Sequence, residues 1–284
     1  MTESLFTTYE QLGARHTRPM AATFLVKTVV PYLRTEGPAE VREAMTSAAA
    51  YLCYCLGWMA VDEGLQGLAQ RYYVRGLELA GAGGDHLTYC YLLRGMSAQA
   101  VDLEHGARAV ALADAAAVAA PESGPRLRAF FAGQQAHCYA VAGDRSSALS
   151  SMREAERAMD QAESSGKQRG YGPSTVAYHA AQVRYYLGDV SGSIESLESH
   201  FRLRGPEETL RSDLRFSSIL AERQLEKGHL EAACQTWSRV LEAHSSVHSG
   251  RVDRHVASIG PLLGPYRTSA AARDVYERSR RTAI

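Results

Sequence analysis

Apolar residues recur at intervals of three and four along nearly the whole chain, and no segment alternates apolar and polar side chains for long. The first spacing places apolar side chains on one face of an α-helix, whereas sustained alternation would indicate a β-strand. The pattern therefore predicts an all-α fold. Residues that break helices divide the chain into helices joined as hairpins. These breaks lie at 81–85, 121–125, 143–144, 164–173, 188–189, 205–206, 228–229 and 260–265.

Five predicted tight turns repeat at intervals of 39 to 45 residues, at Gly64, Glu104, Gly143, Gly188 and Gly228. Small residues lie seven positions before each turn (Gly57, Ser97, Ala136, Ala181, Ala221) and five positions after it (Ala69, Ala109, Ala148, Ser193, Ala233). Two antiparallel helices approach closely only where neither carries a bulky side chain. The spacing therefore predicts a stack of about five helical hairpins.

The first of these units resembles the tetratricopeptide (TPR) motif, and the other four match it in part. The matching residues are Leu56-Gly57, Gly64, Ala69, Tyr73 and Gly76-Leu77. Residues 57–85 and 92–116 look more specifically like the TPR region of actinobacterial transcriptional regulators with an amino-terminal helix-turn-helix domain. The resemblance covers about residues 19 to 244. It implies a TPR-like α-solenoid that acts in transcriptional regulation.

We expect one repeat domain between two terminal segments. An amino-terminal extension covers residues 1–18, the repeats cover 19–250, and capping helices cover 251–284. The repeat units are predicted near 48–82, 87–120, 126–165, 174–203 and 209–244. The regulators named above carry a DNA-binding domain ahead of the repeats, and only 18 residues precede them here. The prediction is a module without its own DNA-binding domain, either free-standing or cut from a longer protein.

Charge and composition limit the classes of partner that the chain is expected to bind. The chain has 31 basic and 31 acidic residues, so no chain-wide positive charge is available for direct binding of nucleic acid. No run approaches the roughly 18 consecutive apolar residues of a membrane span, and no leader pattern opens the chain. An odd number of cysteines, five, is typical of reduced core thiols. These features predict a soluble cytoplasmic protein.

In a TPR solenoid the first helix of each hairpin lines the concave face. Positions shortly before each turn therefore predict a ligand groove lined by Tyr54, Trp58, Asp62, Arg94, Asp102, His137, Tyr178, Gln182 and Tyr185. Arg94 is suited to clamp a carboxylate, because its donors match the two oxygens. The alternative is that the aromatic side chains pack between repeats while Arg94 pairs with Asp62 or Asp102. The chain has no asparagine for amide clamps on a peptide backbone, which disfavours a peptide ligand.

Metal and catalytic chemistry are not predicted. His244, His248 and His255 are spaced so that two imidazoles could share a helical face, but their serine-rich surroundings favour a solvated helix end. Cys53 and Cys55 diverge on a helix. The glycine-rich segment 81–85 follows a helix rather than a strand, so it indicates a helix stop. We expect no cofactor, no metal and no enzymatic activity.

Three functions remain open. The first is a sensing module that binds a small molecule or short peptide and changes the activity of a protein partner, such as a helix-turn-helix regulator. The second is a scaffold or homodimer that uses apolar side chains of the outer helices, among them Tyr72, Leu79, Met152 and Met159. The third and least favoured is a biosynthetic enzyme in which His137, Asp62, Asp102 and Tyr178 supply acid and base groups.

Overall fold

The backbone adopts a left-handed conformation at each of the five predicted tight turns. The φ angle is 80° at Gly64, 60° at Glu104, 80° at Gly143, 87° at Gly188 and 82° at Gly228. Such angles suit glycine because it has no Cβ to clash with the backbone, and they end one helix sharply enough for the next to fold back. Four of the five turns therefore use glycine, and the second accepts a glutamate.

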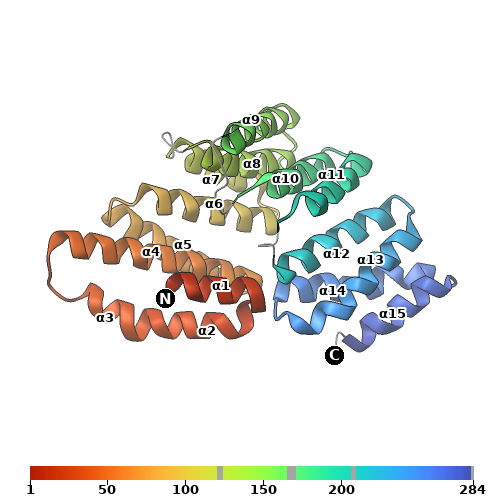
Figure 1. The fold of residues 1–284 in the computed structure, drawn as a ribbon, viewed down its shortest axis with the longest axis horizontal. Helices are drawn as coiled ribbons and strands as arrows, with labels where there is room; N and C mark the ends of the chain where they lie inside the picture. The colour runs from red at the N-terminus through yellow and green to blue at the C-terminus, as the bar shows by residue number, and fades with distance from the viewer. Residues whose placement is uncertain (120–123, 165–170, 206–208, 283–284) are drawn as a thin grey trace.

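A computed structural model describes residues 1–119, 124–164, 171–205 and 209–282. Within those ranges all regular structure is helical, which confirms the predicted all-α solenoid (Figure 1). Five consecutive hairpins form its body. They pair α4 (Ala39–Asp62) with α5 (Gln66–Ala82), α6 (His86–Asp102) with α7 (Gly106–Val118), α8 (Pro125–Val141) with α9 (Arg145–Ser164), α10 (Pro173–Tyr186) with α11 (Val190–Leu203), and α12 (Leu210–Glu226) with α13 (Leu230–Ala243).

The small residues that flank the turns lie where the helices of each hairpin cross. Gly57 is buried, and the other nine side chains are 0% exposed. A Cβ on Gly57 would lie 2.2 Å from the ring of Tyr73. The close approach inferred from the repeat is therefore confirmed, and at Gly57 it leaves no room for a methyl group.

The terminal segments are helical as well. Residues 1–18, set apart above as an extension, form α1 (Thr2–Leu12) and the start of α2 (Ala14–Phe24), which continues through a π-helical turn (Leu25–Val29) into α3 (Val30–Leu33). The chain ends with α14 (Gly250–Leu263) and α15 (Ala270–Thr282), preceded by the 3-10 turns His244–Ser246 and Gly264–Tyr266.

The superhelix closes on itself. In Figure 1 the hairpins form an arc from α4 over α8 to α12, and α1 lies against the far end of that arc. The backbone N–H of His248 donates to the carbonyl of Leu12 at 2.9 Å. Gly13, between α1 and α2, has φ 92°, and a Cβ there would lie 2.2 Å from the carbonyl oxygen of His248. We call this junction of α1, α2 and the end of α4 with α12 and residues 247–253 the seam.

Helix α4 is long and apolar enough, by length and composition, to cross a membrane. This differs from the sequence expectation, which counted only consecutive apolar residues. In the fold, 61% of its most apolar window is buried, and α4 packs against α1, α2, α5 and α6. Its hydropathy is therefore that of a core helix.

Candidate functional site at the inner wall

Aromatic rings form a continuous path across the inner faces of the first helices. Tyr54 on α4 lies 6.4 Å from Trp58 and 5.7 Å from Tyr91 on α6, measured between ring centroids. Tyr91 lies 5.7 Å from Phe130 on α8. These distances are those of favourable edge-to-face and tilted aromatic pairs. Aromatic side chains therefore pack between neighbouring hairpins, as the alternative to a ligand groove predicted.

The path continues into the second half of the chain. Phe130 lies 5.2 Å from Tyr171, whose hydroxyl shares a 2.7 Å hydrogen bond with Nδ1 of His179 on α10. A Cβ on Gly133 would fall 2.3 Å from that nitrogen, so this glycine makes room for the pair. Phe216 on α12 lies 4.4 Å from Tyr178 on α10. We call the surface formed by these rings, from Trp58 to Phe216, the inner wall.

Arginines lie over the rings of this wall. From guanidinium carbon to ring centroid, Arg94 is 3.7 Å from Phe130, Arg251 is 5.4 Å from Trp58, Arg223 is 4.4 Å from Tyr185 and Arg215 is 5.5 Å from Phe216. Each distance falls within the range of a cation–π contact. Within the described residues only Arg251 of these four has a carboxylate at ion-pair distance, that of Asp102. The inner wall therefore carries more positive than negative charge.

Arg94 is the least compensated of these side chains. It is 9% exposed, and its buried Nε has no hydrogen-bond partner among the residues that the structure describes. Burial lowers the pKa of its guanidinium, and the nearby groups that oppose this effect are Tyr54, Tyr171, Cys138 and Tyr178. The alternative expectation, that Arg94 pairs with Asp62 or Asp102, is wrong because both carboxylates are engaged elsewhere.

Asp62 belongs to the seam. It is 0% exposed, and its Oδ1 accepts a 2.7 Å hydrogen bond from the hydroxyl of Ser249. Nη1 of Arg211 lies 3.8 Å from the same oxygen, while Oδ2 is buried without a partner. Arg211 also donates to Glu10 at 2.7 Å and lies 4.6 Å from the ring of Tyr9. Asp62 therefore contributes to closure of the superhelix.

Asp102 forms an ion pair with Arg251, which links α6 to α14. Burial opposes ionisation of this carboxylate and is the largest single effect, but the charges of Arg251 and Arg215 and the hydrogen bond from Arg251 together outweigh it, so the pKa of Asp102 falls below its ordinary value. Asp102 and Arg251 are thus both ionised at neutral pH, and each neutralises the other.

His137 on α8 is neutral at pH 7. It is 9% exposed, and no hydrogen-bond partner for its buried Nε2 lies in the described part of the chain. Burial lowers its pKa to about 3, an effect opposed by Asp102 and reinforced by Arg215, Arg223 and Arg94. A neutral imidazole offers one donor and one acceptor. His137 is therefore available to bind another group without adding charge.

Gln182, Tyr185 and Tyr178 are bound to arginines of α12. Arg223 donates to the side-chain oxygen of Gln182 at 2.6 Å and lies over the ring of Tyr185. The hydroxyl of Tyr178 accepts a 3.4 Å hydrogen bond from Arg215. Their role in this structure is to hold α12 against α10.

The nine predicted residues all lie on the inner sides of α4, α6, α8 and α10, but most of them are buried. Five of them, Tyr54, Arg94, His137, Tyr178 and Gln182, are between 6% and 9% exposed, and Trp58 is half-buried. Closure fills part of the expected groove, because side chains of α12 and α14 contact Trp58, Asp102, Tyr178, Gln182 and Tyr185. Within the described residues, no such hydrogen bond reaches Nε of Arg94 or Nε2 of His137.

Sequence reasoning missed the residues one helical turn earlier and those supplied by closure. Tyr91, Phe130 and Arg215 each lie thirteen positions before a turn, so extending the repeat by one turn of helix would have found them. No comparable signal marks Arg223, which lies five positions before its turn, or Arg251, which reaches the wall from α14 outside the five hairpins.

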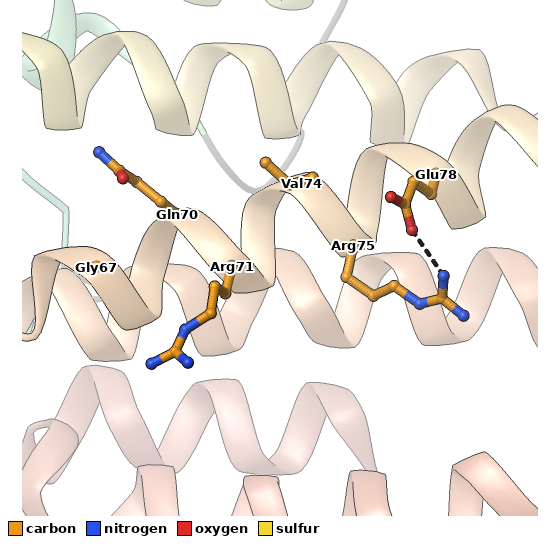
Figure 2. A pocket seen from close by; sticks show the side chains of 6 residues that line it. All are labelled: Gly67, Gln70, Arg71, Val74, Arg75 and Glu78. Atoms are coloured by element: carbon orange, nitrogen blue, oxygen red, sulfur yellow. Dashed lines mark hydrogen bonds and ion pairs between the residues drawn. The ribbon is translucent and has the colours of Figure 1, made fainter.

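The outer face carries shallow hollows of its own. A hollow of about 320 Å³ lies on the exposed side of α5, beside Arg71 and the ion pair of Arg75 with Glu78 (Figure 2). A larger one of about 470 Å³ lies between α5, α6 and α7, with Met96 and Leu112 among its lining residues. The outer patch proposed for Met152 and Met159 is wrong, because these side chains are 6% and 4% exposed.

The histidines of the 244–255 segment have separate partners. Nε2 of His244 lies 2.7 Å from Asp253, Nδ1 of His255 lies 2.8 Å from Glu222, and the ring of His248 packs edge-on against His16. Across the part of the chain that the structure describes, no three metal-ligating side chains come together. All five cysteines are buried free thiols. Burial raises the pKa of Cys53 and of Cys138 to about 11, which disfavours a thiolate.

Comparisons with known proteins support the fold class. No protein family and no curated protein matches the sequence. Among solved structures, a monomeric IFIT1 mutant with m7Gppp-AAAA matches with a TM-score of 0.50 at 14% identity, over 95% of this chain and 62% of that one. Human IFIT1 dimer with PPP-AAAA has a TM-score of 0.48 at 12% identity, over 96% and 69%. MamA from Desulfovibrio magneticus RS-1 has a TM-score of 0.37 at 14% identity, over 70% and 96%.

This chain spans 62% of the length of the first IFIT1 structure, and likeness at such low identity concerns the fold alone. These matches carry no information on the resemblance to actinobacterial helix-turn-helix regulators, which stays a prediction. The chain is a TPR-like α-solenoid built from helical hairpins.

Proposed function

We propose that this chain is a sensing module that holds a small anionic ligand at its inner wall and reports its presence to a protein partner. Among the buried side-chain atoms that have no hydrogen-bond partner within the described residues, two lie at the inner wall, Nε of Arg94 and Nε2 of His137, and these two carry the proposal. A core selected only for stability satisfies its buried polar groups or replaces them with apolar ones. Groups left unsatisfied in this way are typical of a binding site.

The seam supplies a way to transmit occupancy. It is held by a few polar contacts, including those of Asp62 with Ser249 and of Arg211 with Glu10. A ligand that binds the closed form more tightly than an opened form shifts the population toward closure. Because Arg251 contacts both Trp58 and Asp102 close to the seam, a change at the wall alters the contacts that hold α14.

The partner that fits the sequence resemblance is a helix-turn-helix transcriptional regulator, on the same polypeptide or on a separate one. The five buried thiols favour a reducing compartment, and the proposed location is the cytoplasm. We expect binding rather than catalysis, because Asp62 and Asp102 already serve as ion-pair and hydrogen-bond partners. A bound mass that matches an oligonucleotide, such as the m7Gppp-AAAA of the monomeric IFIT1 mutant, would instead support a nucleotide ligand.

The experiment is native mass spectrometry of the full chain purified from its source organism, followed by the same measurement on Arg94→Met. We expect the wild type to carry a small additional mass that denaturation releases and that the variant loses. Arg71→Met, on the exposed face of α5 (Figure 2), is the matched control and should retain the mass. The melting temperature of the wild type is also measured with and without an extract of the source organism. Wild-type protein that carries no bound species, and whose melting temperature the extract does not change, would contradict the proposal.

A scaffold function is the second candidate, and the hollow between α5, α6 and α7 favours it. That hollow joins the apolar side chains of Met96, Leu103 and Leu112 to the polar groups of Gln70 and Arg108, a combination suited to a protein surface. Crosslinking at a cysteine introduced in place of Arg108 would test it. A partner captured there, and lost on Leu103→Glu, would support a scaffold.

A further inference from the structure

We infer that Arg94 receives a carboxylate group of the ligand, with the rings of Phe130 and Tyr54 against the ligand's apolar part. This inference rests on the proposed function and specifies its ligand class. Arg94 is nine-tenths buried and lies 3.7 Å above Phe130. Stacking on the ring leaves the edges of the planar guanidinium, which carry its N–H donors, free to bind a two-oxygen acceptor.

Arg94 differs from the other inner arginines in having its donors available. Arg223 donates to Gln182, to the hydroxyl of Ser193 and to the carbonyl of Ala181. Arg251 is paired with Asp102, and Arg211 is paired with Glu10. Within the described residues Arg94 donates no such bond. An anionic group of a ligand could therefore accept hydrogen bonds from donors of Arg94 that are not already in use.

Charge balance favours a carboxylate over a phosphate. The bound group is required to neutralise one buried guanidinium, because within the described residues no carboxylate lies at ion-pair distance from Arg94. A carboxylate carries a single negative charge and matches the guanidinium with two parallel hydrogen bonds. A phosphate carries close to two charges at this pH, and burying the second one beside Arg94 would cost free energy without a partner.

The surroundings indicate what the carboxylate is attached to. Tyr54, Tyr91, Phe130 and Phe131 form a cluster on this part of the wall, with centroid distances of 5.5 to 6.2 Å between contacting rings of the four. Such a surface favours a planar or apolar body next to the acid group. Two sources fit this chemistry, a free aromatic or aliphatic acid and the carboxyl terminus of a short peptide.

The test measures thermal stability and binding heat of the full chain with acetate, benzoate, benzamide, inorganic phosphate and a short apolar peptide in its free-acid and amidated forms, all at matched ionic strength. We expect acetate and benzoate to raise the melting temperature of the wild type, and benzamide and phosphate to leave it unchanged. A response to the free-acid peptide, and not to its amide, would assign the peptide source. A response to benzoate alone would assign the small acid.

Two variants make the result specific. Arg94→Met should weaken benzoate binding by about tenfold or more, as loss of a charged hydrogen-bond partner does, while Arg71→Met keeps wild-type affinity. Arg94→Gln, which retains two donors without charge, serves if the Met variant does not fold by circular dichroism. Equal responses to benzoate and benzamide, unchanged affinity in both Arg94 variants, or no carboxylate response in the wild type would overturn the inference. A source-derived ligand retained by Arg94→Met would overturn it and leave the proposed function standing.

Discussion

The hydroxyl of Ser249 donates a 2.7 Å hydrogen bond to the carboxylate of Asp62, 187 residues earlier in the chain. The same hydroxyl accepts from the backbone N–H of Val252 at 3.4 Å and so caps the first turn of α14. Asp62 is the last residue of α4. One side chain therefore starts α14 and fixes it to the end of the first helix of the first hairpin.

Ser249→Ala should lower the free energy of unfolding by about 2 kcal/mol, because it removes an N-cap and a hydrogen bond to a buried carboxylate. Urea titration followed by circular dichroism measures the change. Ser150→Ala, at an exposed position of α9, should stay within about 0.5 kcal/mol of the wild type. Equal stabilities of the two variants would show that the Ser249 contact contributes nothing to the fold.

Arg211→Met should open the seam selectively. It leaves Asp62 and Glu10 without their guanidinium, and breaking a buried ion pair on one side costs about 3 to 5 kcal/mol. We expect faster hydrogen exchange in α1 and α2 than in α8. Arg15→Met is the control, because Arg15 pairs with Asp253 while its side chain is 58% exposed, and it should change little. Uniform loss of protection across all helices would contradict local opening.

Stability should fall as the pH is lowered from 7 to 5. Burial lowers the pKa of His137 to about 3 and that of His179 well below its ordinary value. Below the unfolded pKa of about 6.5, the unfolded chain therefore binds protons that the folded chain excludes. For His137 this should cost about 2 kcal/mol at pH 5, and His179 should act in the same direction.

Urea titrations at both pH values measure this dependence. His137→Gln should be less sensitive to acid than the wild type, whereas His86→Gln, outside the inner wall, should match the wild type. A His137→Gln variant with the wild-type pH dependence would show that His137 does not titrate as described.

Trp58→Ala should abolish the response to ligand and leave the fold intact. Trp58 is half-buried, with its ring between Tyr54 and Arg251, so its loss removes contact area on the wall without emptying the hairpin core. Calorimetry with benzoate measures affinity, and circular dichroism measures folding. Tyr32→Ala, at a side chain 58% exposed, is the control. Unchanged affinity in a folded Trp58→Ala protein would remove this residue from the site.

Gly57→Ala and Gly67→Ala should change stability in opposite directions. A Cβ on Gly57 would lie 2.2 Å from the ring of Tyr73, whereas nothing lies within 4 Å of one on Gly67. Overpacking at Gly57 should cost about 1 to 3 kcal/mol. At Gly67 the higher helix propensity of alanine should add up to about 1 kcal/mol. Thermal unfolding separates the two outcomes, and stabilisation by Gly57→Ala would contradict the packing described for this hairpin.

The hairpin architecture could be predicted because its signals are local. Gly64 and Gly228 mark turns with positive φ, and Ala69 and Ala233 mark the crossing points five residues later. A turn angle and a close helix crossing each depend on a few neighbouring residues. Both therefore leave a pattern that repeats along the chain.

Much of the candidate site could not be predicted, because its contacts are not local. Arg251 meets Asp102 across 149 residues, and Arg211 meets Glu10 across 201. The repeat pattern does not predict whether the superhelix closes. Closure determines whether Tyr54 and His137 line a hollow or become buried. Met152 was likewise predicted to lie at an outer surface. The residues that surround it depend on how neighbouring repeats stack, which the sequence of one repeat does not specify.

Closure also restricts how this architecture can change. Units of an open solenoid touch only their neighbours, so a chain can gain or lose one and remain folded. Here the bond from His248 to Leu12 requires that the last hairpin arrive at the height and angle of the first. Deleting or duplicating a single hairpin would misalign the two ends, so length variation among relatives should be confined to interhelical loops.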